Sequence, residues 1–303
     1  MLETLLADHS KILAECAIAE RLRRNPAVTL HPTLYNAPLV YGPVVAQSAM
    51  AEIYGEYITA AAAADLPLLL TSPTWRVDKE RIAEAGINPN INADAVAFML
   101  SVRDKFSVIG APLVLVGALT GPKGDCYRPD LAPNAVEAEE FHSQQINELA
   151  VTDADFLQTQ TLPSVTEALG IARAMAKTGK PYVISFCTGS DGKVLDGHSL
   201  PEAFRIIDED VQLIKAPTAY YVNCTHPQFL LDHYEIGELD RLKGIQANGS
   251  SKDVTKLDGS SETIADPVSD WAEAMLKLHE YHGVQILGGC CGTGLEHMQA
   301  LVR

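Results

Sequence analysis

Three cysteines are the residues of this 303-residue chain best suited to chemistry. Cys290 and Cys291 are adjacent in the segment VQILGGCCGTGLEHM, and Cys224 ends the apolar run AYYVNC. Three thiolates and one open position make a catalytic zinc site, because a closed structural site would use a fourth protein ligand. Zinc there would lower the pKa of an incoming thiol and hold it as a thiolate. The cysteines therefore predict a zinc-dependent alkyl transfer to sulfur.

Other interpretations of the cysteines stay open at this stage. The adjacent pair could form a vicinal disulfide and act as a redox switch. Cys16 and Cys187 read as small core residues, and Cys126, in the segment GPKGDCYRP, reads as an ordinary loop residue. The N-terminal 24 residues lack the uninterrupted apolar stretch of a signal peptide, so we expect a cytoplasmic protein with reduced thiols.

The elements that must position these cysteines follow an alternating pattern. Short apolar runs typical of buried parallel strands alternate with longer helical stretches. The predicted strands are Ala27–His31, Leu66–Ser72, Leu113–Leu119, Asp155–Thr161, Tyr182–Cys187, Ala219–Asn223, Gly244–Ala247 and Val284–Gly288. The predicted helices are Val44–Ala64, Asn92–Phe106, Ala135–Val151, Val165–Thr178, Leu200–Lys215, Pro227–His233, Pro267–His282 and Leu295–Val302.

Eight strand–helix pairs predict a single (β/α)8 TIM barrel over residues 1–303, with a leading helix in 1–24 and the barrel in 25–303. Active sites of such barrels lie at the carboxyl ends of the strands, where Cys224 and the Cys290–Cys291 pair would meet. Ser164, followed by Glu167, predicts a capping box at the start of one helix. The mid-helix His142 is expected at the surface or at a cap.

Charge and composition exclude several classes of function. The net charge is −16 and the pI is about 4.9, which argues against a nucleic-acid partner because phosphate binding needs a basic face. No run of about 18 apolar residues predicts a membrane span. Nucleotide-binding glycine motifs and the H-E-x-x-H zinc motif are missing. The polar segment Ala247–Pro267 could be a lid over the catalytic face or an ordinary surface loop.

The segment GGCCGT, followed by Glu296 and His297, and the upstream VNC resemble the homocysteine S-methyltransferase family. Further similar stretches, in the family's order, are GALTGPKGD, EEFHSQQINELAVTDADFLQTQTLPSVTEA, PYVISFCTGSDGKVLDGHSL and YYVNCTHP. The resemblance implies a (β/α)8 barrel that moves a methyl group from a small donor to the thiol of homocysteine, giving methionine. It also implies that Cys224, Cys290 and Cys291 bind Zn²⁺.

Two positions depart from the family's pattern. Its first strand usually ends in an acidic residue, whereas the predicted first strand here has only polar neighbours, namely His31, Thr33 and Asn36. Its fourth strand commonly carries a glutamate that would pair with the substrate's ammonium group, and Gln160 stands there instead. A neutral amide offers the weaker, uncharged hydrogen bond.

The resemblance also implies which residues contact the substrate. They are Gln160 and Asn248, together with Asn223, whose amide could instead fix the loop that carries Cys224. The donor could be S-methylmethionine, S-adenosylmethionine or a related onium compound, and a folded corrinoid protein is a further candidate. Rival functions are methyl transfer to a different acceptor on the same fold, and a zinc-binding or redox-sensing protein without catalysis. The sequence does not set the oligomeric state.

Overall fold

The computed structural model describes residues 1–107, 109–252 and 264–302. Within them, eight parallel strands form a closed barrel in which each strand pairs with its neighbour in sequence and the last strand pairs with the first. The strands are β1 (Ile12–Ala14), β2 (Leu68–Thr71), β3 (Val114–Thr120), β4 (Phe156–Thr159), β5 (Tyr182–Phe186), β6 (Ala219–Asn223), β7 (Leu242–Ala247) and β8 (Ile286–Gly289). The predicted TIM barrel is confirmed.

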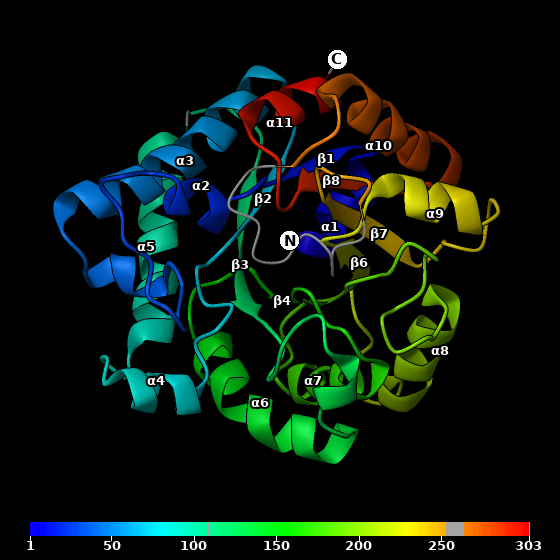
Figure 1. The fold of residues 1–303 in the computed structure, drawn as a ribbon, viewed down its shortest axis with the longest axis horizontal. Helices are drawn as coiled ribbons and strands as arrows, with labels where there is room; N and C mark the ends of the chain where they lie inside the picture. The colour runs from blue at the N-terminus through cyan, green and yellow to red at the C-terminus, as the bar shows by residue number, and fades with distance from the viewer. Residues whose placement is uncertain (108, 253–263, 303) are drawn as a thin grey trace.

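Helices surround the barrel on its outside, and Figure 1 shows this ring around the central strands. The helices of the described residues are α1 (Leu2–Asp8), α2 (Ala19–Arg23), α3 (Val44–Ala63), α4 (Lys79–Ala85), α5 (Ile91–Phe106), α6 (Ala135–Ala150), α7 (Val165–Lys177), α8 (Leu200–Val211), α9 (Pro227–His233), α10 (Val268–His282) and α11 (Leu295–Leu301), with short 3₁₀ helices η1 (Ala37–Tyr41) and η2 (Pro129–Leu131). None of these helices is both long and apolar enough to cross a bilayer.

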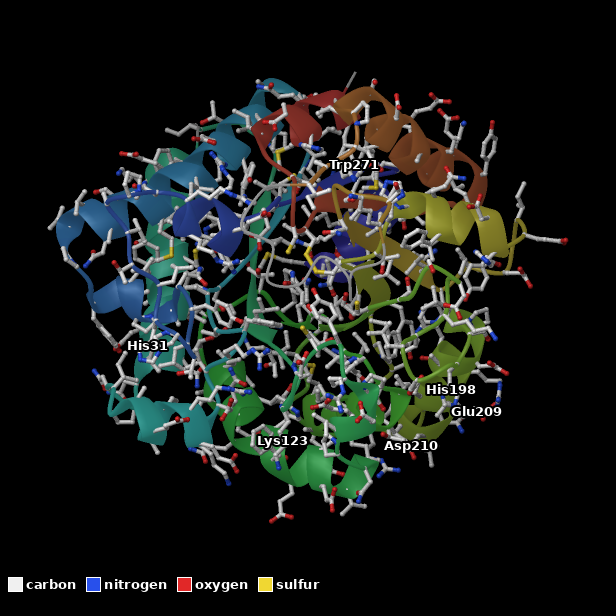
Figure 2. The ribbon with its side chains drawn as sticks, in the orientation of Figure 1. His31, Lys123, His198, Glu209, Asp210 and Trp271 are labelled. Carbon is white, nitrogen blue, oxygen red and sulfur yellow. A yellow bond between two sulfur atoms is a disulfide. The ribbon has the colours of Figure 1, made fainter. Side chains whose placement is uncertain are left out.

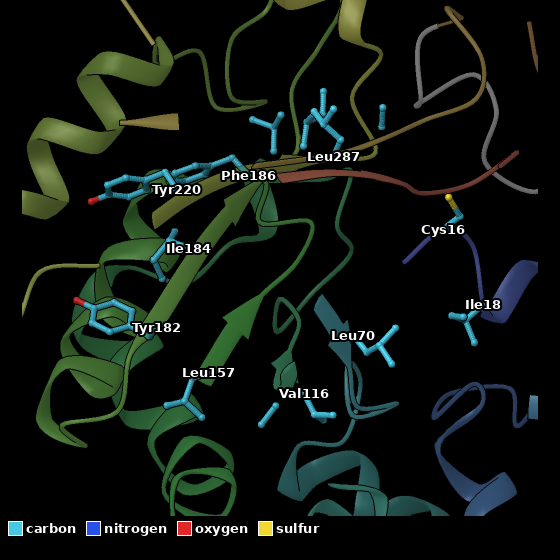
Figure 3. Packing of buried hydrophobic residues seen from close by; sticks show 14 of the residues in the cluster. Cys16, Ile18, Leu70, Val116, Leu157, Tyr182, Ile184, Phe186, Tyr220 and Leu287 are labelled. Carbon is cyan, nitrogen blue, oxygen red and sulfur yellow. The ribbon is translucent and has the colours of Figure 1, made fainter. Parts of the chain in front are cut away.

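Residues within a strand alternate between two apolar layers. On β5, Tyr182, Ile184 and Phe186 belong to the large layer between strands and helices, as Figure 3 shows. Val183 belongs instead to the smaller cluster that fills the barrel interior. Because both faces of each strand are buried, the strands read as continuous apolar runs in the sequence. Most of the stability therefore comes from layers that are independent of the polar face where the site lies.

Helix α1 closes the amino-terminal end of the barrel. Leu2 and Leu5 are buried in the interior cluster together with Ile12 of β1 and Ile286 of β8. Figure 1 shows the N-terminus and α1 near the centre of the ring. One end of the barrel is thus sealed by apolar contacts, and the opposite end is left for function.

The position of the first strand was predicted wrongly. Residues 27–31 form no strand, and β1 lies at Ile12–Ala14, inside the segment expected to be one leading helix. The boundaries 1–24 and 25–303 are therefore also wrong, because the barrel begins at Ile12. A buried strand of three residues is too short to show a period of two, and the flanking α1 and α2 give the whole segment a helical pattern.

The predicted capping box at α7 is only half present. Ser164 accepts a hydrogen bond from the Thr166 backbone, but the Glu167 side chain does not return to the cap. Its carboxylate accepts from the Lys123 backbone at 2.6 Å and lies 3.0 Å from Nε2 of the fully buried His142. His142 is therefore a core residue and not a surface one, because its buried imidazole can form a hydrogen bond with the buried Glu167 carboxylate.

The polar segment Ala247–Pro267, which could be a lid or an ordinary surface loop, lies only partly within the described residues. Ala247 ends β7, and Asp266 returns to the site, where its backbone N–H donates to the Gly249 carbonyl at 2.7 Å. Residues 253–263 of this segment lie outside the described part of the chain, so the choice between a lid and a surface loop stays a prediction.

Candidate metal and substrate site

The three predicted ligand cysteines meet at the carboxyl end of the barrel. Cys224 follows β6, and Cys290 and Cys291 follow β8. Their sulfur atoms all lie within 4.8 Å of one another. Cys224 and Cys290 are joined as a disulfide, with Cα atoms 5.5 Å apart. The vicinal Cys290–Cys291 disulfide of the redox interpretation is thus not the pairing that the structure contains.

This cluster fits a tetrahedral zinc ion once the cysteines are reduced. Zn–S bonds of about 2.3 Å in a tetrahedral site place neighbouring sulfurs about 3.8 Å apart. The three cysteine sulfurs lie within 4.8 Å of one another, so their spacing is compatible with this geometry. Soft thiolates select zinc over hard cations such as Mg²⁺ and Ca²⁺. Cys224 is buried, Cys290 is half-buried and Cys291 is exposed, so the cluster is reachable from one side. Three protein sulfurs leave one tetrahedral position for a substrate.

The backbone at Cys224 is held in an unusual conformation. Its φ is +53°, a left-handed value that costs a residue with a side chain about 1–3 kcal/mol. The N–H of Cys224 donates to the Gln246 carbonyl at 3.2 Å, and the Cys187 thiol contacts the Cys224 carbonyl at 4.0 Å. These contacts fix the direction of the Cys224 side chain toward the β8 loop.

Asn223 supports this turn from behind. Its Oδ1 accepts hydrogen bonds from the Thr161 backbone and from the Ser185 hydroxyl, both at 2.7 Å. Its Nδ2 donates to Thr161 Oγ1 at 2.8 Å and approaches Cys224 Sγ at 3.7 Å. Because the whole amide is engaged, the structure supports the loop-fixing alternative for Asn223 rather than contact with substrate.

The loop after β8 is fixed by polar contacts at each residue. The Cys290 N–H donates to the Ala247 carbonyl at 2.7 Å, and the Thr293 hydroxyl donates to the Cys290 carbonyl at 2.6 Å. The Gly292 N–H donates to the Glu20 carboxylate at 2.5 Å. The loop that carries two of the three sulfurs is thus tied to β7 and to α2, which preorganises it for a metal.

A cavity of about 720 Å³ opens beside the sulfurs. Gln160 and Gln246 line it, and Gln160 Nε2 donates to Gln246 Oε1 at 2.8 Å. Gln158 donates to the same oxygen at 3.1 Å, and Gln246 Nε2 donates to the Glu15 carbonyl at 3.3 Å. Because Nε2 is committed to Gln246, the amide oxygen is the group that Gln160 can offer a substrate.

Glu15 is the acidic residue that the sequence analysis missed. It directly follows β1, lines the cavity and is 5% exposed. Thr71 donates to its carboxylate through the backbone N–H at 2.8 Å and through the hydroxyl at 2.5 Å. Burial raises the pKa of Glu15 from 4.5 to about 8, and these hydrogen bonds partly oppose the rise. The statement that no acid ends the first strand is wrong, because the strand itself was misplaced.

Asn248 also lies at the cavity, as predicted. Its side chain is 2% exposed, and Oδ1 is buried without a hydrogen-bond partner among the described residues. Both backbone polar groups of Asn248 are hydrogen-bonded. The ring N–H of Trp271, a residue of α10 labelled in Figure 2, donates to the Asn248 carbonyl at 3.0 Å. The Asn248 N–H donates to the Thr225 carbonyl. A buried oxygen without a donor is a suitable partner for a substrate N–H. Its role as a substrate contact stays a prediction.

The three polar residues expected near the first strand end have other surroundings. His31 Nδ1 accepts from the backbone of Thr33 and of Leu34, both at 3.2 Å, so it closes a local turn. Figure 2 shows His31 toward the edge of the molecule in that view. Asn36 does line the cavity, but from the loop before η1.

Comparison with known proteins gives the family. The model of the homocysteine S-methyltransferase family matches residues 3–303. The chain belongs to the homocysteine S-methyltransferase family. It is 23% identical to the homocysteine S-methyltransferase YbgG of Bacillus subtilis, over 99% of this chain and 96% of that one. This membership identifies the chain as a methyltransferase-type enzyme.

Solved structures agree on the fold of this family member. The homocysteine methyltransferase MmuM of Escherichia coli superposes with a TM-score of 0.75 in its metallated form, at 19% identity over 99% of this chain and 98% of that one. The oxidised form of MmuM gives a TM-score of 0.77 at the same identity and coverage.

Proposed function

We propose that this chain catalyses zinc-dependent transfer of a methyl group from a small sulfonium donor, such as S-methylmethionine or S-adenosylmethionine, to the thiol of homocysteine, giving methionine. The observation that carries the proposal is the convergence of Cys224, Cys290 and Cys291 beside a cavity that contains a buried acid. The metallated form of MmuM and the family itself are further support for a metal at such a site.

The three cysteines would hold the ion, and Thr293, Glu20 and Asn223 would position them. Zinc, when bound, would lower the pKa of the acceptor thiol so that it reacts as a thiolate at neutral pH. The N–H of Asn223 that approaches Cys224 Sγ favours the thiolate form of that cysteine, because a donor stabilises negative charge on sulfur.

Glu15 and the glutamines would orient the acceptor. An incoming ammonium group would stabilise the ionised form of Glu15, whose pKa of about 8 otherwise keeps it largely protonated at pH 7. The amide oxygens of Gln160 and Asn248 could accept further hydrogen bonds from the same group. The acid near the first strand therefore compensates for the glutamate that Gln160 replaces.

The reaction needs no other group from the protein. The thiolate sulfur of homocysteine attacks the methyl carbon of the donor in line with its leaving sulfur. A new carbon–sulfur bond forms, and the electron pair of the broken bond stays on the donor, which leaves as a neutral thioether. The walls of the cavity would bring the two sulfurs together, so that the transfer proceeds between groups already held in position.

The test is methionine formation by reduced, zinc-loaded protein with homocysteine and either sulfonium donor. We expect turnover that is lost on chelation and in Cys224→Ala. Cys126→Ala is the matched control, because Cys126 is also a buried cysteine at the cavity but stands outside the three-sulfur cluster. Turnover by Cys224→Ala, or by metal-free wild-type protein, would contradict the proposal.

A further inference from the structure

One side of the cavity is chemically unlike the sulfur side. Tyr35, Trp75, Arg76 and Tyr127 line it, from the loops that follow β1, β2 and β3. The sulfurs stand after β6 and β8, and the acid Glu15 stands after β1. One side of the cavity thus carries the sulfurs and an acid, and the other side carries aromatic rings and the cationic side chain of Arg76.

Arg76 is fixed in place by its neighbours. Its guanidinium lies over the Trp75 ring at 4.5 Å and over the Tyr35 ring at 5.9 Å from the centroids. One Nη donates to the Gly124 carbonyl at 3.0 Å. Stacked arginine loses less side-chain entropy when it binds a ligand, because its rotamer is already selected.

Trp75 is itself locked beneath this cation. Its ring N–H donates to the Gln160 carbonyl at 3.1 Å, and its carbonyl accepts from the Gly121 N–H at 2.8 Å. A Cβ at Gly121 would lie 2.4 Å from Trp75 Nε1, so only glycine allows this close approach. The aromatic support of Arg76 is therefore built into the loops after β2 and β3.

Arg76 nevertheless lacks an anionic partner among the described residues. None of the ion pairs of the described chain includes Arg76, and its Nε is buried without an acceptor. Arg81, the neighbouring arginine at the cavity, differs because it pairs with Asp78 and donates to the Lys123 carbonyl. A stacked guanidinium with unused donors is a suitable receptor for a carboxylate, which it binds through two parallel hydrogen bonds.

We propose that Arg76 recognises the methyl donor by binding a carboxylate on it, so that the enzyme selects onium donors that also carry a carboxylate. This inference rests on the proposed function. Glu15, Gln160 and the sulfurs supply the contacts that the acceptor needs, which leaves the arginine side for the second substrate. A donor with only positive charge would be repelled by Arg76, whereas a carboxylate would offset that repulsion.

The test compares two donors that differ in one group, S-methylmethionine and its decarboxylated sulfonium amine, with zinc-loaded protein and saturating homocysteine. In Arg76→Gln we expect the KM for S-methylmethionine to rise about 10- to 100-fold, the size of a lost hydrogen bond to a charged group. The KM for homocysteine should stay within about twofold, and the KM for the decarboxylated donor should fall or stay the same, because the variant removes a repulsive charge. Arg76→Lys, which keeps the charge without the planar fork, should recover part of the loss.

Arg23→Gln is the matched control, because Arg23 is exposed at the same cavity and its loss changes the net charge equally. The KM values of Arg23→Gln should equal those of the wild type. This result would separate specific binding of a carboxylate by Arg76 from a general electrostatic effect of positive charge at the cavity mouth. An equal effect of Arg76→Gln on both donors, or an effect on the homocysteine KM instead, would overturn the assignment.

A second measurement keeps this inference separate from the proposed function. Calorimetric binding of S-methylmethionine to zinc-loaded protein requires no turnover, so it remains informative if methyl transfer to homocysteine fails. We expect wild type to bind at least tenfold more tightly than Arg76→Gln. Equal binding by the two proteins, or binding by neither, overturns the role of Arg76.

Discussion

Glu15 is a buried carboxyl at the cavity that accepts two hydrogen bonds from Thr71. It stands directly after β1, at the end of the first strand, and it lines the same cavity as Gln160. The geometry explains why its pKa is raised, since burial opposes its charge more than the two Thr71 hydrogen bonds favour it. A positively charged ligand would reverse this balance.

We predict that Glu15→Gln impairs recognition of homocysteine in particular. A hydrogen bond to a charged group contributes about 1 kcal/mol more than a neutral one, so the KM for homocysteine should rise about fivefold. The control is a deaminated thiol of similar length, whose turnover should be unchanged because it has no ammonium group. An equal loss of turnover with both thiols would mean that Glu15 maintains the structure of the barrel and does not bind the ammonium group of the substrate.

The same residue predicts a pH dependence of stability. The pKa of Glu15 is higher in the folded protein, about 8, than its ordinary value of 4.5. Its contribution to stability is therefore fully present below about pH 4.5 and is lost as the pH rises through 8.

Urea unfolding of reduced, metal-free wild type and Glu15→Gln would measure this contribution. The free energy of unfolding of wild type, minus that of the variant, should fall steadily between pH 5 and about 8.5. A difference that stays flat over this range would show that Glu15 titrates near its ordinary value. Glutamine is the appropriate variant because it is close in shape to a protonated glutamate.

Among the elements, the loop after β8 must be positioned most precisely, because it places two of the three sulfurs. Two of the three sulfurs lie on it, and Thr293 bridges it to the first strand region by donating to the Cys290 carbonyl and accepting from the Ala17 N–H at 3.4 Å. Loss of an outer contact of this kind typically weakens metal binding about 10- to 100-fold.

We predict that Thr293→Val weakens zinc affinity about tenfold without unfolding the barrel, because valine keeps the shape but not the hydroxyl. Competition with a chromophoric chelator would measure the affinity. Thr178→Val is the matched control, since Thr178 makes a comparable bond to the Met175 carbonyl at the end of α7, away from the site. Equal affinities for the Thr293 variant and the wild type would mean that the loop is held by its other contacts.

Seven of the eight strands could be placed from the sequence because each is an apolar run long enough to be recognised between two helices. The shortest, Ile12–Ala14, could not, because it lies between α1 and α2 and shows no alternation of its own. Because this strand was missed, Glu15 was not recognised as the acid at its end. The apolar run ILA followed directly by a glutamate was the pattern that could have indicated it.

The site was predictable to the extent that residue type determines chemistry. Cysteines at neighbouring strand ends predict that their sulfurs meet, and the sulfurs of Cys224, Cys290 and Cys291 do so in the structure. The contacts of Asn223 with Thr161 and Ser185 depend on strands far apart in the sequence, and no local pattern encodes them. The same is true of Arg76, whose stacking on Tyr35 and Trp75 appears only in three dimensions.

At the scale of the whole molecule, the barrel separates stability from function. The apolar layers and the seal formed by α1 lie around and below the strands, whereas the sulfurs, Glu15 and the cavity lie at the carboxyl ends. Variants of the cysteines should therefore lose metal while the barrel stays folded. We propose that the three sulfurs form one zinc site with a position open to the thiol of homocysteine.

Zinc X-ray absorption of the reduced, zinc-loaded protein, recorded with and without homocysteine, tests that claim most directly. We expect one zinc per chain with three sulfur neighbours at about 2.3 Å, and a fourth sulfur neighbour when homocysteine is added. Cys224→Ala should bind no stoichiometric zinc, and Cys126→Ala should give the wild-type spectrum. A shell that already holds four protein ligands, or one that homocysteine leaves unchanged, would contradict the account.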